Sequence, residues 1–372
     1  MLVGGSFSSG RRAPAIGHKR SRCPIVNALP LMLLIAIALG GCSLPGSVQP
    51  TVKIGLVAPF EGLYRTVGYD ALYAAKLAVR EANVRGGLGG YLVELVALDD
   101  SNLPGRALVA AEEMALDPDV VAVIGHFSDV TTEAALPVYG SYNLPLVIPA
   151  SGADLGIAGG EVAFRLGPGD EDVARTLASY VCQGATRVAL LEDGKRREAS
   201  YLRAFQEHCA TGGVSLLSPG SQLAWDDYSV LIWPGEAVEG AVILSRLRSS
   251  GFKGAFAGGM ELCSHHFKAF AGEKAGKVIC VLAGPAPPPY DFVTSYQSLA
   301  GTPPGPYAPL VYDAAQVIMA AIEEAASNGH VTREAVAEAL KRCSLEGLTG
   351  PITFDEKGRR ENPPMRVQTA TW

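Results

Sequence analysis

The sequence predicts an α/β protein that contains parallel sheets with helices on both faces. Short runs rich in valine, leucine and isoleucine alternate with longer stretches whose apolar residues recur at helical spacing, as is typical of strands joined by crossover helices. The chain has 372 residues, of which 48% are apolar and 18% are charged. That apolar share excludes an intrinsically disordered chain, and the length exceeds what one hydrophobic core usually serves. We therefore expect two lobes.

The first half of this alternation starts near residue 52. Strands are predicted over residues 52–58, 92–98, 120–124 and 146–148, and helices over 66–84, 104–116 and 131–142. Pro59 and Pro149 stop the first and last of these strands, and Gly86 with Gly87 stops the first helix.

The second half continues the same pattern on both sides of a proline-rich segment. Strands are predicted over residues 162–166, 187–191, 214–217, 230–233, 255–256, 277–282 and 352–354, and helices over 171–181, 198–210, 236–250, 307–327 and 332–342. Residues 284–289 (GPAPPP) can form neither a helix nor a central strand, so they mark a boundary. Only residues 218–229 separate two of the strands, which leaves little room for a full helix between them.

The amino terminus has the pattern of an export signal. Residues 1–41 hold five basic residues, no acidic residue and a short apolar run over 31–39, which is too short for the ~20 residues of a membrane-spanning helix. The residues up to Cys42 also resemble a bacterial lipobox, in which the cysteine receives a lipid. We expect a signal peptide over 1–41, lipidation at Cys42 and a tether over 42–50, with an ordinary signal peptide as the alternative.

Five cysteines follow Cys42, so at least one of them has no partner within this set. They are Cys182, Cys209, Cys263, Cys280 and Cys343. Outside the cytoplasm some of them could pair, but the sequence leaves the pairing open, and buried unpaired cysteines are the alternative.

Several function classes are disfavoured by the sequence. The net charge of −6 argues against non-specific binding to nucleic acid, which needs a basic surface. The adjacent His265 and His266 are expected to be a surface pair rather than a metal site, and Asp99 with Asp100 to form turn and cap hydrogen bonds. Residues 272–278 lack the spacing of a phosphate-binding loop. We therefore expect no enzyme activity, no metal and no cofactor.

A series of short motifs resembles the branched-chain amino acid branch of the type I periplasmic binding proteins. The motifs are residues 53–62 (KIGLVAPFEG), 82–90 (ANVRGGLGG), Asp99-Asp100, 121–125 (VAVIG) with Ser128, 145–150 (PLVIPA), Phe164-Arg165, 307–313 (YAPLVYD) and 348–358 (LTGPITFDEKG). Each motif is weak alone, but together they keep the family's order along most of the chain.

The resemblance implies two Rossmann-like lobes joined by three chain crossings, with a ligand bound between them. The crossings would lie near residues 165–169, 284–289 and 345–351. One lobe would then hold residues 51–166 and 286–346, and the other 167–285 and 347–372. A protein of this family captures a solute by hinge closure and delivers it to an ABC permease. We therefore expect a monomeric, extracytoplasmic lipoprotein anchored to the cell membrane, in the periplasm or at the outer cell surface.

The resemblance also implies which loops meet the ligand. The candidate ligand-binding residues are Ser128, Asp129, Ala150, Ser151, Gly152, Arg197, Glu236 and Glu261. Asp129 falls where the family has a hydroxyl that contacts the ligand carboxylate, and two carboxylates there would repel each other. Arg197 and Glu236 fall where the family has tyrosines.

Two interpretations of these departures remain open. In the first, the protein binds a small polar solute other than an ordinary branched-chain amino acid. In the second, the pocket is degenerate and the protein is a ligand-sensing or protein-binding scaffold with the same fold. A hydrolase or dehydrogenase would need a nucleophile–base pair or a dinucleotide-binding loop, and the sequence contains neither.

Overall fold

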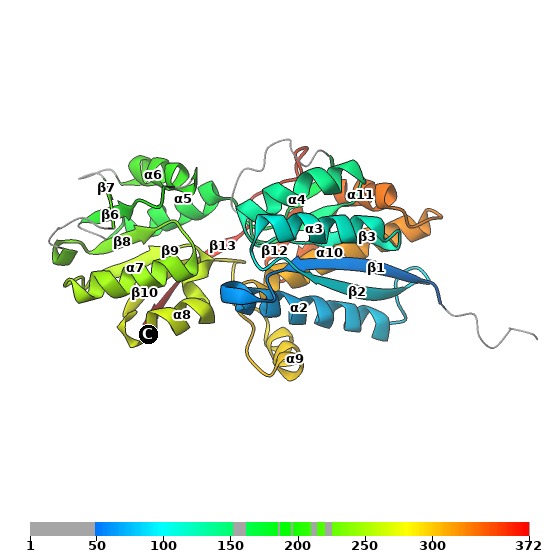
Figure 1. Cartoon of the computed structure of the whole chain (residues 1–372), viewed down its shortest axis with the longest axis horizontal. Coiled ribbons are helices and arrows are strands. Elements are labelled where there is room, and N and C mark those ends of the chain that lie inside the picture. Colours follow the sequence, from blue (N-terminus) through cyan, green and yellow to red (C-terminus); the bar gives the residue numbers. More distant parts are fainter. Residues whose placement is uncertain are drawn as a thin grey trace, which may run out of the picture. The chain divides into compact units, whose positions relative to one another are not determined.

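The strands of the chain form two main sheets, each in its own lobe (Figure 1). The structure is a computed structural model that describes residues 49–151, 161–184, 187–194, 196–209, 214–219 and 225–371. The predicted signal peptide, Cys42 and Gly152 lie outside these residues. Within the described part of the chain, no helix has the length and apolar character needed to cross a membrane.

The sheet of the first lobe has five parallel strands in the order β2-β1-β3-β4-β5. They are β1 (Thr51–Ala58), β2 (Leu92–Asp99), β3 (Val120–Ile124), β4 (Leu146–Ile148) and β5 (Ala163–Arg165). Successive residues of a strand point to opposite faces of the sheet, and each face is covered by a pair of helices. Leu56 packs in the core with α2 (Arg65–Val84) and α10 (Ala308–Ser327). Val57 packs in the opposite core with α3 (Pro104–Leu116) and α4 (Asp129–Ser141). The continuous apolar runs of the sequence are therefore strands buried on both faces.

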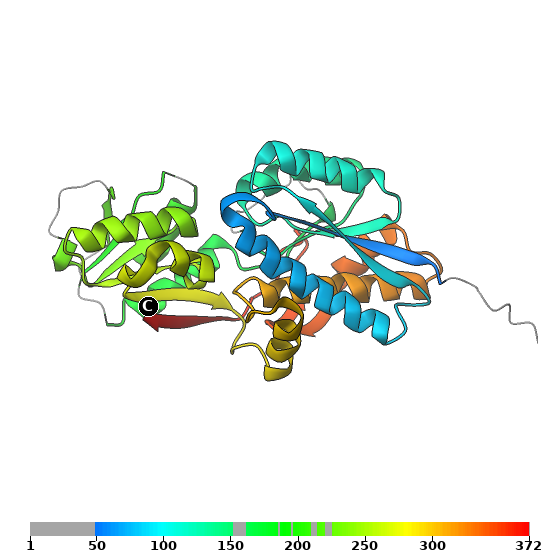
Figure 2. The same cartoon turned by 60° about the horizontal axis from the view of Figure 1, so that its bottom comes forward.

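The sheet of the second lobe has six strands in the order β13-β10-β9-β8-β6-β7. They are β6 (Val188–Leu191), β7 (Ser215–Leu217), β8 (Val230–Trp233), β9 (Ala255–Gly258), β10 (Lys277–Ala283) and β13 (Met365–Thr371). β13 alone among them runs antiparallel, and Figure 2 shows it in dark red beside the yellow β10. Leu190 faces the core under α5 (Asp170–Val181) and α6 (Arg196–His208), whereas Leu191 faces α7 (Ala237–Ser249) and α8 (His265–Ala271).

After β10 the chain returns to the first lobe and then leaves it again. The returning elements are α9 (Tyr290–Ala300), α10, α11 (Arg333–Lys341) and the hairpin of β11 (Ser344–Gly347) and β12 (Gly350–Thr353). The carboxylate of Asp313 on α10 holds this hairpin, because it accepts hydrogen bonds from the backbone N–H of Leu348 at 2.7 Å and of Thr349 at 2.8 Å. The final segment then supplies β13 to the second sheet.

The protein contains elements that periodicity does not predict, namely α8, α9, β11 and β13. α9 directly follows the prolines and buries only Phe292 and Tyr296, so its apolar face is narrow. β13 is an edge strand with no fully buried residue, and therefore lacks the apolar run that marks the central strands. The predicted strand at 352–354 is also shifted, because the strand begins at Gly350.

Two disulfides settle the cysteine pairing that the sequence leaves open. Cys182 at the end of α5 pairs with Cys209 after α6, and Cys263 pairs with Cys280 on β10. Among the described cysteines, Cys343 is the free one.

Candidate functional site

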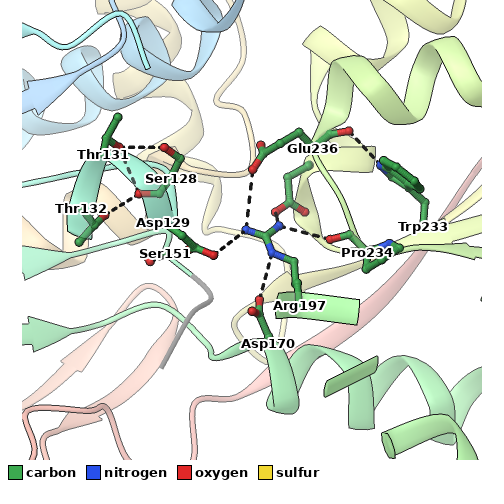
Figure 3. Close-up of polar contacts among 11 residues, drawn as sticks. Ser128, Asp129, Thr131, Thr132, Ser151, Asp170, Arg197, Trp233, Pro234 and Glu236 are labelled. Atoms are coloured by element: carbon green, nitrogen blue, oxygen red, sulfur yellow. Dashed lines mark hydrogen bonds and ion pairs between the residues drawn. The ribbon is translucent and has the colours of Figure 1, made fainter. Parts of the chain in front are cut away.

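The side chain of Arg197 lies among four carboxylates from different loops (Figure 3). Its guanidinium nitrogens lie 3.3 Å from Glu261 Oε1, 3.4 Å from Asp170 Oδ1, 3.6 Å from Asp129 Oδ2 and 3.8 Å from Glu236 Oε1. Nη1 also lies 3.4 Å from the carbonyl oxygen of Pro234. The arginine side chain is only 11% exposed. We call these five side chains the Arg197 cluster.

The topology of parallel sheets explains how residues so far apart in the sequence meet. Each member of the Arg197 cluster follows the carboxyl end of a strand: Asp129 follows β3, Asp170 follows β5, Arg197 follows β6, Glu236 follows β8 and Glu261 follows β9. Parallel strands place these ends at one edge of their sheet, where open α/β sheets bind ligands. Asp129 comes from the first lobe, so the cluster spans the edges of both sheets.

The Arg197 cluster holds one positive group and four acidic groups in partly dehydrated surroundings. Burial raises the pKa of Glu261 to about 7, while the charge of Arg197 opposes this rise. Burial also disfavours the charge of Arg197, yet the four carboxylates together raise the pKa of its guanidinium well above the usual value. The cluster therefore keeps a fixed cation that faces acidic groups from both lobes.

The first-lobe side of the cluster is organised by hydroxyl groups. Ser151 Oγ donates to Asp129 Oδ1 at 2.7 Å, which orients the carboxylate that faces Arg197. The hydroxyl of Ser128 lies instead within the first turn of α4, 2.8 Å from Thr131 Oγ1, and is buried. Ala150 directly precedes Ser151 and is partly buried.

Next to the loop that follows β3, three fully buried polar side chains form a hydrogen-bonded series that the sequence does not predict. His126 Nδ1 lies 2.8 Å from Asp100 Oδ2, and His126 Nε2 lies 3.1 Å from the hydroxyl of Tyr139. Asp99 does form the expected turn bonds, since it accepts from the backbone N–H of Phe60 and Ser101. Asp100 caps its turn at Asn102 but also anchors His126.

The structure brings together five of the eight predicted site residues. They are Asp129, Ser151, Arg197, Glu236 and Glu261. Asp170 was missed, although its position after β5 and the turn residues Gly167, Pro168 and Gly169 could have pointed to it. Within the described residues, no group of three or more histidine, cysteine or acidic side chains is arranged to hold a metal ion.

The expectation of a surface pair at His265 and His266 is wrong for His266. Its side chain is buried, and its ring lies 4.8 Å from Phe270 and 5.9 Å from Tyr64, between ring centroids. Only His265 is exposed. The reason is that α8 is short and packs against α2, so His266 and Phe267 both face inward.

Comparisons with known proteins identify the family to which this chain belongs. A model of the periplasmic binding proteins matches residues 51–232 and 235–371. The chain belongs to this family. The resemblance found in the sequence and the predicted fold class of two Rossmann-like lobes are thereby confirmed.

Relatives of this periplasmic binding protein match most of its length. It is 24% identical to the Leu/Ile/Val-binding protein of Escherichia coli strain K12 over 330 residues, which covers 82% of this chain and 87% of the relative. The structure of the leucine-binding protein LivK from Thermotoga maritima matches with a TM-score of 0.74, 24% identity and coverage of 86% and 96%. LivJ from Streptococcus pneumoniae in complex with isoleucine matches with a TM-score of 0.73, 21% identity and coverage of 83% and 93%.

The same fold accommodates other small molecules in other proteins. A solute-binding protein of an ABC transporter from R. palustris in complex with benzoate matches with a TM-score of 0.70, 18% identity and coverage of 86% and 93%. The fold alone therefore does not specify the ligand of this chain, which depends on the residues of the site.

Proposed function

We propose that this protein is the extracytoplasmic solute-binding component of an ABC importer. Membership of the periplasmic binding protein family supports this, as do relatives named as amino-acid-binding proteins. The solute enters between the two lobes, contacts both of them and stabilises their closed arrangement, which the permease recognises. In this function the protein makes and breaks no bond.

The same proposal includes the anchoring and the division of the chain. The export signal over residues 1–41, the lipid on Cys42 and the tether over 42–50 hold a monomer at the membrane surface. The first lobe comprises residues 51–166 and 286–346, and the second 167–285 and 347–372. Support for this division comes from strands β1 to β5 in one sheet and β6 to β10 in the other.

We further propose that the solute carries a positive charge on an amine, amidine or guanidine group. The observation that carries this is the Arg197 cluster, in which the side chains that face the guanidinium are acidic and come from both lobes. Asp129 would repel the free carboxylate of an aliphatic amino acid, whereas a cation is attracted by Asp129, Glu236 and Glu261. The solute cation joins Arg197 or displaces it. Ser128, Ala150 and Ser151 form the first-lobe wall.

Thermal unfolding of the full-length protein with a ligand panel tests this proposal. Agmatine and putrescine should raise the midpoint temperature, because a ligand at about 100 times its dissociation constant adds about 2.7 kcal/mol of stability. Leucine and glutamate should have no effect. The variant Asp129→Asn should weaken amine binding, and Asp291→Asn, at an exposed position on α9, serves as the control. A shift with leucine that survives Asp129→Asn would contradict the proposed solute class.

One observation favours a second candidate, a sensing or protein-binding scaffold with a degenerate pocket. The pair of Arg197 and Asp129 joins loops of the two lobes through the protein's own side chains. In a scaffold, this guanidinium takes the place of a solute cation. The two candidates separate in the variant Arg197→Ala: a scaffold gains amine binding that the wild-type protein lacks, whereas a transporter component already binds amines before the substitution.

A further inference from the structure

The outward face of α3 carries exposed apolar side chains. Leu108, Val109 and Leu116 are 40%, 51% and 70% exposed, although α3 otherwise packs beside α4 on one face of the first sheet (Figure 1). Val109 and Leu116 are seven residues apart, so they lie on the same side of the helix, and the core side is filled by Ala111 and Met114. Apolar side chains gathered on the solvent side of a helix mark a surface that another molecule covers. We call this side the outer α3 face.

Two opposite charges flank the outer α3 face. Arg106 and Glu113 are also seven residues apart, so they lie on the same flank, and both are exposed. Arg106 Nη1 lies 3.0 Å from Asp99 Oδ2, but the arginine side chain is 59% exposed and keeps further N–H donors for a second acid. Within the described residues Glu113 takes part in no ion pair. A cation and an anion at this spacing can complement their own copies.

An antiparallel pair of α3 helices satisfies both features at once. A two-fold axis beside Ala110 places residues at equal distances on either side of it opposite each other. Arg106 of each copy then meets Glu113 of the other, since their levels along the helix differ by only about 1.5 Å. Leu116 of each copy faces Gly105 of the other, where a Cβ atom would meet nothing within 4 Å in its own chain. The leucine side chain therefore finds open space above the glycine.

This pairing is weak. Glu112 is exposed and lies two residues from the axis, so its carboxylate comes near the same group of the second copy and the two repel. One helix from each copy also buries less than the ~1,200 Å² at which stable protein interfaces begin. The protein is therefore a monomer in dilute solution and pairs where its copies are crowded.

We propose that the outer α3 face is a contact surface for a second copy of this chain, formed between copies that are held on one membrane. The inference goes beyond solute capture and rests on the proposed anchoring only for the crowding of copies. Tethers confine all copies to one surface, which raises their effective concentration. The membrane fits this face less well, because anionic lipids would repel Glu112 and Glu113.

Disulfide cross-linking of the full-length protein tests the proposal. Val109→Cys in a Cys343→Ala background places a thiol beside the two-fold axis, so two copies can be joined through it. The initial rate of cross-linking should exceed that of Glu356→Cys, at an exposed position away from α3, by about tenfold. The background protein alone reports cross-links through the remaining cysteines. A rate for Val109→Cys no higher than that for Glu356→Cys would overturn the proposal.

Charge exchange on the flank separates pairing from chance collision. In the Val109→Cys protein, Arg106→Glu and Glu113→Arg should each lower the rate about fivefold, because both symmetry-related ion pairs are lost. The two exchanges together should restore the rate. Arg106→Glu also loses the pair with Asp99, so the restoration is the informative result. Glu112→Gln should raise the rate, because it removes the repulsion at the axis. Absence of restoration would overturn the proposed geometry.

A change in the apolar stripe completes the test. Leu116→Asp in the Val109→Cys protein should reduce cross-linking to the control rate, whereas Val242→Asp, at an exposed position on α7, should leave it unchanged. Equal effects of the two variants would contradict the proposal. So would cross-linking that stops when phosphatidylcholine vesicles protect the new thiol from a water-soluble maleimide, because the membrane would then cover this face. All rates are measured without solute, so failure here is distinguishable from failure of the proposed function.

Discussion

Nη2 of Arg197 lies 3.6 Å from Oδ2 of Asp129, so the first turn of α6 in the second lobe is paired with the first residue of α4 in the first lobe. The same guanidinium faces Asp170, Glu236 and Glu261. The Arg197 guanidinium thus reduces the repulsion among these carboxylates.

Replacing Arg197 by alanine should destabilise the protein by about 3–5 kcal/mol, because it removes the buried guanidinium that faces four carboxylates. Methylguanidinium should restore part of this stability, since it can occupy the position of the lost group. Urea unfolding with and without methylguanidinium measures both effects. Arg175→Ala is the control, because the exposed pair with Glu171 should contribute no more than about 1 kcal/mol. Equal losses in the two variants would contradict the role given to Arg197.

Glu261 should make stability depend on pH. Its pKa is raised from 4.5 to about 7, so the folded protein binds this proton more tightly than the unfolded chain does. The stabilising contribution is therefore complete below about pH 4.5 and is lost as the pH rises through about 7, with an upper limit of about 3 kcal/mol. Glu261→Gln mimics the protonated form and should be more stable than the wild-type protein at pH 8.

Urea unfolding between pH 5 and pH 8 measures this difference, and the two proteins should converge at the acidic end. Glu356→Gln, at an exposed position, is the control. A constant difference between wild type and Glu261→Gln over this range would rule out the raised pKa.

Much of the fold could be predicted from the sequence, because strands buried on both faces have continuous apolar runs. The helix at Pro104–Leu116 begins and ends where proline and apolar spacing predict. β13 could not be predicted, since an edge strand has no such run. The loops of the site could also be predicted, because they follow the carboxyl ends of the strands. The pairing of Arg197 with carboxylates of both lobes could not be predicted, because it depends on how the lobes pack against each other. His266 was misassigned because adjacent residues of a short helix can be buried or exposed depending on what packs against them.

Asp70→Ala should destabilise the protein by about 2–4 kcal/mol, because four donors lose their acceptor at once. The loop at 302–307 should also become more accessible to protease, since Asp70 fastens it to α2. Asp291→Ala, at an exposed position on α9, is the control and should change stability by less than about 0.5 kcal/mol. An unchanged rate of cleavage within this loop would contradict the fastening role.

Removal of either disulfide should lower the free energy of unfolding by about 3 kcal/mol, as expected for cross-links that span 27 and 17 residues. The double variants Cys182→Ala with Cys209→Ala, and Cys263→Ala with Cys280→Ala, measure each bridge by urea unfolding.

Burial raises the pKa of the Cys343 thiol to about 11, so this cysteine should react slowly with alkylating reagents in the native protein. Rapid modification of Cys343 would show that its side chain is accessible.

The position of β13 has a consequence for synthesis of the protein. β10 pairs with β13 along its whole length, from Lys277 with Thr371 to Ala283 with Met365. During translation β10 emerges well before β13, and the return segment of the first lobe is made in between. Until the last codons are read, β10 is an unprotected edge that can pair with another nascent chain. Premature termination near residue 360 should therefore yield an aggregating product rather than a weakened binding protein.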